Sequence, residues 1–163
     1  MLSRLIQRRH LADLTEAEVL ALAIGAEEED ARLYRIYAEG LRADFPDSAA
    51  MLDAMAEEED THRSLLIDRF KRRFGTVIPP VNRAQIAGFP TRRPYWQVQA
   101  QGLERIRAEV AMMERDAMRF YTAAAGRSHD ADTRKLLGDL AAAEAGHQRT
   151  AHELAEQHLD SDA

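Results

Sequence analysis

The stretch from residue 75 to residue 95 divides this chain into two parts. Its helix breakers are Pro79, Pro80, Gly88, Pro90 and Pro94. No single helix can run through them, because proline lacks a backbone donor and clashes with the preceding turn. On either side Ala, Leu, Glu and Arg dominate, and aromatic residues make up only 6% of the chain, a composition that favours helix over strand. The sequence therefore predicts two helical parts joined by an irregular connection.

Each part has the pattern of a hairpin of two long helices. Thr15 and Glu18 form a capping box at the start of the first helix. Ser48 is the expected cap of the second helix, and Gly75 ends it. Within one domain spanning 1–163, the expected ranges are an arm or short helix at 1–14, helices at 15–43 and 48–74, a crossover at 75–95, and helices at 96–126 and 128–158.

The crossover is long enough to run the whole length of such a bundle. About 20 residues span ~65 Å when extended at ~3.3 Å per residue, and a helix of about 27 residues is only ~40 Å long. We therefore predict an all-α fold, a four-helix bundle of two helical hairpins joined by a long crossover, with a short N-terminal helix or arm.

Composition excludes several classes of protein and site. The chain has no Cys, which excludes disulfides, thiolate zinc sites and iron–sulfur clusters and is typical of a reducing compartment. The formal net charge of −6 argues against nucleic acid as a partner. The sequence contains neither a membrane-spanning apolar run nor the pattern of a signal peptide, so we expect a cytoplasmic protein.

Two Glu-x-x-His motifs carry the candidate chemistry. One is Glu59-Asp60-Thr61-His62, and the other is Glu144-Ala145-Gly146-His147. The spacing puts a carboxylate and an imidazole on one face of a helix, about one turn apart. A single motif of this kind arises by chance in a Glu-rich chain. Two of them, each in the second helix of a hairpin, indicate a site.

The first helix of each hairpin matches in the same way. Glu27 lies seven residues before Tyr34, and Glu114 lies seven residues before Tyr121. The offset between these pairs is 87 residues, against 85 for the Glu-x-x-His motifs, and the difference falls in the turns. This pattern indicates an internal duplication of a helical hairpin.

The motif residues fall within the apolar stripes of their helices, so they are expected to point into the core. Unpaired charges are not tolerated there, and four crowded carboxylates would repel one another. Two divalent cations would balance them. The predicted metal ligands are Glu27, Glu59, His62, Glu114, Glu144 and His147, with Tyr34 and Tyr121 beside them in the core as residues that can hydrogen-bond the ligands.

A Glu from each of two helices and a Glu-x-x-His motif from each of the other two is the ligand set of carboxylate-bridged dimetal bundles. In this arrangement Glu59 and Glu144 bridge the ions, while Glu27 and Glu114 are terminal ligands. Oxygen-rich ligation with one imidazole per ion suits two iron ions, with manganese or zinc as substitutes.

The chain resembles ferritin-like proteins of the rubrerythrin group over nearly its whole length. More narrowly, it is similar to the N-terminal ferritin-like domain of the erythrin–vacuolar iron transporter proteins, which are membrane-bound bacterial iron exporters. The narrower resemblance is carried by Leu14-Thr15-Glu16, Glu27-Glu28-Glu29-Asp30, Met55-Ala56-Glu57-Glu58-Glu59, His62-Arg63, the stretch from Phe74-Gly75 to Pro79, Gly88-Phe89 and Pro94-Tyr95-Trp96.

This resemblance implies a non-haem di-iron protein that oxidises Fe(II) with O2 or H2O2, in iron homeostasis and peroxide defence. It also implies a homodimer, and a membrane iron-transporter domain or partner that would place the protein at the inner face of a membrane. The alternative is a non-catalytic, iron-sensing regulatory domain of an iron export system. A metal-free helical interaction module with protonated Glu residues is a third possibility.

The chain differs from typical rubrerythrins in two ways. They carry an extra Glu where this chain has Ala117, and they carry a Cys-rich electron-transfer domain that this chain lacks. Both differences argue against NADH-linked peroxidase turnover.

Several charged residues have competing interpretations. Glu58 can approach His62, but its helical phase faces solvent, and Glu29 is the alternative to Glu27. We expect Asp30 to be a surface charge. We expect the basic runs Lys71-Arg72-Arg73 and Arg92-Arg93 to solvate helix ends, with an anionic membrane surface as the alternative. The remaining histidines are expected on the surface: His10, His129, His152 and His158.

Overall fold

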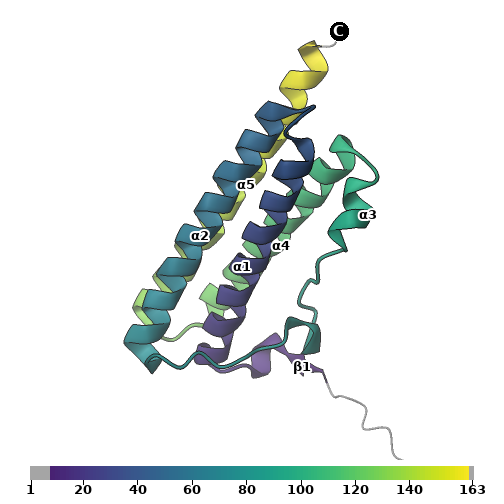
Figure 1. Cartoon of the computed structure of the whole chain (residues 1–163). Helices are drawn as coiled ribbons and strands as arrows, with labels where there is room; N and C mark the ends of the chain where they lie inside the picture. Colours follow the sequence, from purple (N-terminus) through teal and green to yellow (C-terminus); the bar gives the residue numbers. More distant parts are fainter. Residues whose placement is uncertain (1–7, 162–163) are drawn as a thin grey trace, which may run out of the picture.

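The computed structural model describes the backbone of residues 8–161, and the side chains of residues 8–150 and 152. Its long helices are α1 (Glu16–Leu41), α2 (Pro46–Phe74), α4 (Leu103–Arg127) and α5 (Ala131–Ser161). They pack side by side as a four-helix bundle (Figure 1), with α1 paired to α2 and α4 paired to α5. The predicted all-α bundle of two hairpins is confirmed. Residues 1–7 of the predicted arm lie outside the described residues.

The helix starts differ in how well local sequence predicts them. At α1, the Thr15 hydroxyl accepts the Glu18 N–H at 3.2 Å, and the Glu18 carboxylate accepts the Thr15 N–H at 3.3 Å, as the capping box predicts. The expected Ser48 cap of α2 is wrong, because the helix begins two residues earlier, at Pro46. Proline fits the first helical turn, where its missing N–H would have no helical partner anyway.

The expected single helix at 96–126 is also wrong. The structure has a short helix α3 (Tyr95–Gln99) followed by α4 from Leu103, and Figure 1 shows the two as separate segments joined by a turn. Gly102 stands between them with φ +89° and ψ −172°, a conformation essentially restricted to glycine. The helix is interrupted there because a residue without a Cβ can adopt the backbone conformation that this sharp change of direction requires.

The crossover is tied to the start of the chain by a short pairing that the sequence pattern did not predict. Strand β1 (Arg9–His10) pairs in parallel with β2 (Ile86–Ala87), and Arg9 lies opposite Ile86. Each strand adjoins a single 3-10 turn, Leu11–Asp13 after β1 and Arg83–Gln85 before β2. The crossover then continues to α3 alongside the bundle (Figure 1).

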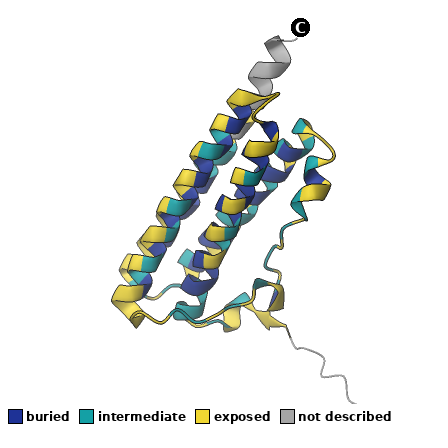
Figure 2. Cartoon of the chain, viewed as in Figure 1, coloured by how far each residue is buried: buried dark blue, intermediate teal, exposed yellow. Residues whose placement is uncertain are grey.

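The apolar core forms two clusters at different heights along the bundle. One contains Leu20, Leu66, Phe70 and Leu137, and the other contains Tyr37, Leu52, Val98, Ile106 and Met113. Figure 2 shows the buried faces of the helices turned toward one another and the exposed faces turned outward. The candidate site lies on the helix segments between the two clusters. Among the described residues, no helix has both the length and the apolar character needed to cross a membrane.

Candidate metal centre

All of the predicted metal ligands lie together inside the bundle. Each of the four long helices contributes at least one of them, at positions between the two apolar clusters. The four carboxylates and His62 are buried, with no more than 7% of any residue exposed, and His147 is half-buried. The residues are Glu27 on α1, Glu59 and His62 on α2, Glu114 on α4, and Glu144 and His147 on α5.

These residues form two overlapping groups, each with the shape of a cation site. The His62 group is Glu27, Glu59, His62 and Glu144, and the His147 group is Glu59, Glu114, Glu144 and His147. Within each group, one oxygen or nitrogen from every residue lies within 4.8 Å of the others. Only Glu59 and Glu144 belong to both groups, which is the position that bridging carboxylates would occupy.

Both histidines present the same ring nitrogen to the carboxylates. Nδ1 of His62 lies 3.5 Å from Glu144 and 3.8 Å from Glu27. Nδ1 of His147 lies 3.3 Å from Glu114, 3.6 Å from Glu144 and 3.8 Å from Glu59. The two rings are nearly parallel, with an interplanar angle of 15° and centroids 6.1 Å apart. The two imidazoles therefore flank the shared carboxylates in the same orientation.

Without a cation, this arrangement perturbs the acid–base properties of its members. Burial and the adjacent carboxylates raise the pKa of Glu59 well above its usual range and that of Glu114 to about 8. Burial alone would lower the pKa of His62, but Glu144 and Glu27 outweigh it and raise the value to about 9. Protons therefore balance the carboxylates in the metal-free site, and a bound cation would replace them.

Several buried ligand atoms have no hydrogen-bond partner. They are Oε2 of Glu27, Oε1 of Glu59, Nδ1 of His62 and Oε1 of Glu144. Buried polar atoms are normally paired, so such a cluster needs an explanation. All four belong to the His62 group. Oxygen and imidazole donors that converge without partners fit a divalent cation such as iron or manganese.

Two buried tyrosines link the hairpins at the site. The Tyr34 hydroxyl of α1 donates to Oε1 of Glu114 on α4 at 2.5 Å, and the Tyr121 hydroxyl of α4 donates to Oε1 of Glu27 on α1. Burial and the nearby carboxylates raise the pKa of both hydroxyls well above the usual value, so both remain protonated donors. Each terminal carboxylate is thus held by a tyrosine from the opposite hairpin.

Asp30 is not a surface charge, and the expectation that it would be exposed is wrong. It is only 4% exposed and faces the Arg92 side chain, which is also buried. Arg92 was expected to solvate a helix end or face a membrane surface, and that expectation is wrong too. Asp30 follows Glu27 by three residues on α1, so the same helical stripe that placed Glu27 inside could have placed Asp30 there.

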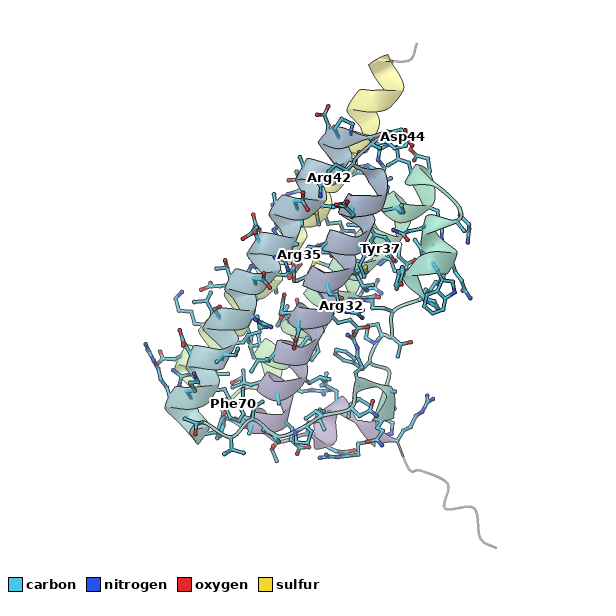
Figure 3. All side chains as sticks on the ribbon, viewed as in Figure 1. Arg32, Arg35, Tyr37, Arg42, Asp44 and Phe70 are labelled. Carbon is cyan, nitrogen blue, oxygen red and sulfur yellow. The ribbon has the colours of Figure 1, made fainter. Side chains whose placement is uncertain are left out.

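Most of the other charged residues either form ion pairs or are exposed to solvent. Glu29 pairs with Arg83 of the crossover, and Glu28 lies 3.7 Å from Arg63. Glu58 contacts His147 of α5 rather than His62. On the outer face of α1 and α2, Arg35 pairs with Asp60 at 2.5 Å, and Figure 3 shows its side chain between these helices. Apart from the buried Glu27, Asp30 and Glu59, the acidic residues at 27–30 and 57–60 are therefore ion-paired or exposed.

The histidines outside the site are exposed where they are described. His10, His129 and His152 are on the surface, and the side chain of His158 lies outside the described residues. Lys71, Arg72 and Arg73 are exposed at the end of α2. One buried charge was missed entirely: Glu109 is 2% exposed and pairs with Arg105 at 3.2 Å.

Comparison with known proteins agrees with this architecture. The family profile described as Rubrerythrin matches residues 18–155, a range that includes all six candidate ligands. A hypothetical protein from Pyrococcus furiosus superposes with a TM-score of 0.70 at 25% identity, over 92% of this chain and 94% of that one. An uncharacterized conserved protein from Magnetospirillum magnetotacticum MS-1 does so with a TM-score of 0.70 at 25% identity, over 88% and 95%. No curated protein matches the chain.

Proposed function

The chain belongs to the rubrerythrin family, and from this membership we propose that it is a non-haem di-iron protein that oxidises Fe(II) with O2 or H2O2. Its use would be in iron homeostasis and peroxide defence. The observation that carries the proposal is the pair of donor groups, each with one imidazole, that share Glu59 and Glu144.

The ligand set fits two iron ions by charge as well as by donor type. Four carboxylates balance two divalent cations, and two neutral imidazoles complete the set. When bound, two ferrous ions would supply the two electrons that reduce one H2O2 to water, while both ions become ferric. The side chains that would hold them are Glu27, Glu59, His62, Glu114, Glu144 and His147.

The protein's own contribution is to bury the carboxylates and to control which ligands carry protons. The protons on Glu59 and Glu114 must leave as cations bind, because only ionised carboxylates are good ligands. Tyr34 and Tyr121 keep one oxygen of each terminal carboxylate hydrogen-bonded, which leaves the other oxygen to face the ions. Burial excludes water that would compete for the same ligand atoms.

The test is anaerobic loading with two equivalents of Fe(II), followed by O2 or H2O2. Ferric absorption in the near ultraviolet should grow in with the wild-type chain. Glu59→Ala and Glu144→Ala should each abolish it, because each variant removes a donor from both groups. Glu57→Ala is the matched control, since this glutamate is 81% exposed and lies outside both groups. If oxidation is absent in the wild type, or equal in Glu59→Ala, the proposal fails.

One feature favours the non-catalytic, iron-sensing alternative. Each donor group draws residues from both hairpins, since Glu144 joins the residues of α1 and α2, and Glu59 joins those of α4 and α5. Metal occupancy would therefore clamp one hairpin to the other and change the stability of the whole fold. Strong stabilisation by Fe(II) with no oxidation of it would support the sensor and contradict the oxidase.

A further inference from the structure

Glu58 contacts the outer side of a candidate metal ligand. It precedes Glu59 on α2, but its side chain is 56% exposed, whereas that of Glu59 is buried. One of its carboxylate oxygens meets Nε2 of His147 on α5. The other ring nitrogen of His147, Nδ1, faces Glu114, Glu144 and Glu59. The imidazole therefore lies between an outer carboxylate and the inner donor group.

This contact selects the form of His147 that can bind a cation. A neutral imidazole carries one N–H, and the nitrogen without it supplies the lone pair. Nδ1 contacts Oε2 of Glu114 at 3.3 Å. When a metal ion takes the place of that contact, Glu58 accepting from Nε2 would keep the ring proton on Nε2 and leave the Nδ1 lone pair for the ion. A carboxylate in this position also fixes the ring and increases its basicity, and removing such a partner typically weakens metal binding about 10–100-fold.

His62 lacks the equivalent partner. In the duplicated hairpin, the counterpart of Glu58 is Ala143, which precedes Glu144 as Glu58 precedes Glu59. The part of the chain that the structure describes places no carboxylate in hydrogen-bond contact with Nε2 of His62, and Nδ1 is buried without a hydrogen-bond partner. The two donor groups therefore match in their inner residues but differ in the support of their imidazoles.

We propose that Glu58 is a positioning residue that makes the His147 group the tighter of the two cation positions, so that the two ions bind in order. The inference rests on the proposed di-metal function and adds a difference in metal affinity between its two cation positions. A chain with tight and weak positions would hold one ion while the second is exchanged, which is useful for a protein that takes up and releases iron.

The experiment is a titration of the full metal-free chain with Co(II) under anaerobic conditions, followed by visible absorption. The wild type should bind in two steps. His147→Ala should remove the tighter step, and His62→Ala should remove the weaker one. Glu58→Ala should weaken the tighter step about 10–100-fold and leave the weaker step in place. Because Glu58 is exposed, circular dichroism should show an unchanged fold.

Glu57→Ala controls for the loss of one negative charge near the site. Glu57 is 81% exposed, and its ion-pair contact is with Arg35 at 3.9 Å. If Glu57→Ala weakens the tighter step as much as Glu58→Ala does, the effect is general electrostatic attraction and the positioning role is wrong.

The duplication also offers a gain-of-function variant. Glu58→Ala combined with Ala143→Glu moves the outer carboxylate to the His62 side. This double variant should regain a tight binding step, and adding His62→Ala to it should remove that step.

The hydrogen bond to Glu58 can also be followed by proton NMR. In the Co(II)-loaded wild type, the paramagnetically shifted ring N–H proton of His147 should exchange slowly with solvent, and Glu58→Ala should speed that exchange.

The two proposals fail in different ways. If the wild type binds no Co(II) and no Fe(II), the di-metal function itself is wrong. If the wild type binds two ions but Glu58→Ala leaves both steps and the N–H exchange unchanged, the di-metal function stands and the role of Glu58 is wrong.

Discussion

The guanidinium group of Arg92 donates two parallel hydrogen bonds to the carboxylate of Asp30. Its Nε lies 2.8 Å from Oδ1 and its Nη2 lies 2.9 Å from Oδ2, and Nη1 reaches Asp116 of α4 at 3.4 Å. Burial alone would lower the pKa of Arg92, but Asp30 and Asp116 outweigh it and the net shift is upward. Arg92 therefore ties the crossover to both α1 and α4, one turn away from Glu27.

Replacing Arg92 should destabilise the protein strongly. Arg92→Ala leaves the Asp30 carboxylate buried without its partner, and breaking a buried pair in this way typically costs about 3–5 kcal/mol. The free energy of unfolding of the metal-free chain, from denaturant titration, measures it. Arg93→Ala is the control, because Arg93 is exposed and its loss should change the free energy by less than about 0.5 kcal/mol. The double variant Arg92→Ala/Asp30→Ala should recover part of the loss, and strict additivity would contradict the pairing.

The tyrosines at the site should affect metal binding rather than folding alone. Tyr34→Phe removes the donor to Glu114 and Tyr121→Phe removes the donor to Glu27, so each should weaken Co(II) binding about 10-fold or more. Tyr37→Phe is the matched control. Its hydroxyl is buried without a hydrogen-bond partner, so removing it should leave metal binding unchanged and stability equal or higher. Equal Co(II) affinity in all three variants would contradict the role of Tyr34 and Tyr121.

The stability of the chelator-treated protein should fall as the pH rises from about 6 to about 9. Burial and Glu144 raise the pKa of Glu114 to about 8, and nearby carboxylates raise that of His62 to about 9. Both groups bind protons more tightly in the folded state than in the unfolded state. Their contribution to the free energy of unfolding is therefore complete below the pKa values of the unfolded chain, and it is lost as the pH rises through the higher pKa values of the folded chain. Denaturant titrations at several pH values test the slope. Glu114→Gln should flatten it, and a rising slope in the wild type would contradict the shifts.

Metal should reverse this trend. A cation that binds only the folded state stabilises it by about 3–4 kcal/mol at 100 to 1,000 times the dissociation constant. Because the ligands must lose protons first, the gain should increase with pH. Melting of the protein with and without Fe(II), under anaerobic conditions at pH 6 and pH 8, measures both effects. Glu59→Ala/Glu144→Ala should show no gain at either pH.

Two glycines should respond to alanine with opposite signs. Gly102 has φ +89° at the start of α4, so Gly102→Ala should destabilise the fold by about 1–3 kcal/mol. Gly138 lies inside α5 with open space around its Cα, so Gly138→Ala should stabilise it by about 0.5–1 kcal/mol. Thermal unfolding compares them directly. A neutral Gly102→Ala would mean that α3 and α4 can join into one helix.

The hydrophobic periodicity and the repeated motifs were sufficient to predict the bundle, and also to predict that the candidate ligands lie close together. Glu27 and Glu114 could be placed inside because each lies in an apolar stripe of steps of three and four residues. The capping box at Thr15 could be predicted because it depends only on neighbours along the chain.

Features that depend on contacts between distant segments could not be predicted in this way. The stripe that contains Glu27 agrees with an inward Asp30, but nothing in the sequence identifies Arg92, 62 residues later, as its partner. The pairing of Arg9 with Ile86 joins short segments without strand periodicity. The break at Gly102 is ambiguous in sequence, since an isolated glycine can also lie inside a helix.

The sharing of Glu59 and Glu144 between the donor groups bears on how such a site could arise. Each hairpin carries one terminal carboxylate, one bridging carboxylate and one imidazole, which is half of the full set. Two identical copies of a single hairpin, related by a twofold axis, would therefore present all six donors without any crossover. Covalent linkage then adds something that a symmetric pair could not have: each half can change alone, as Glu58 and Ala143 already have.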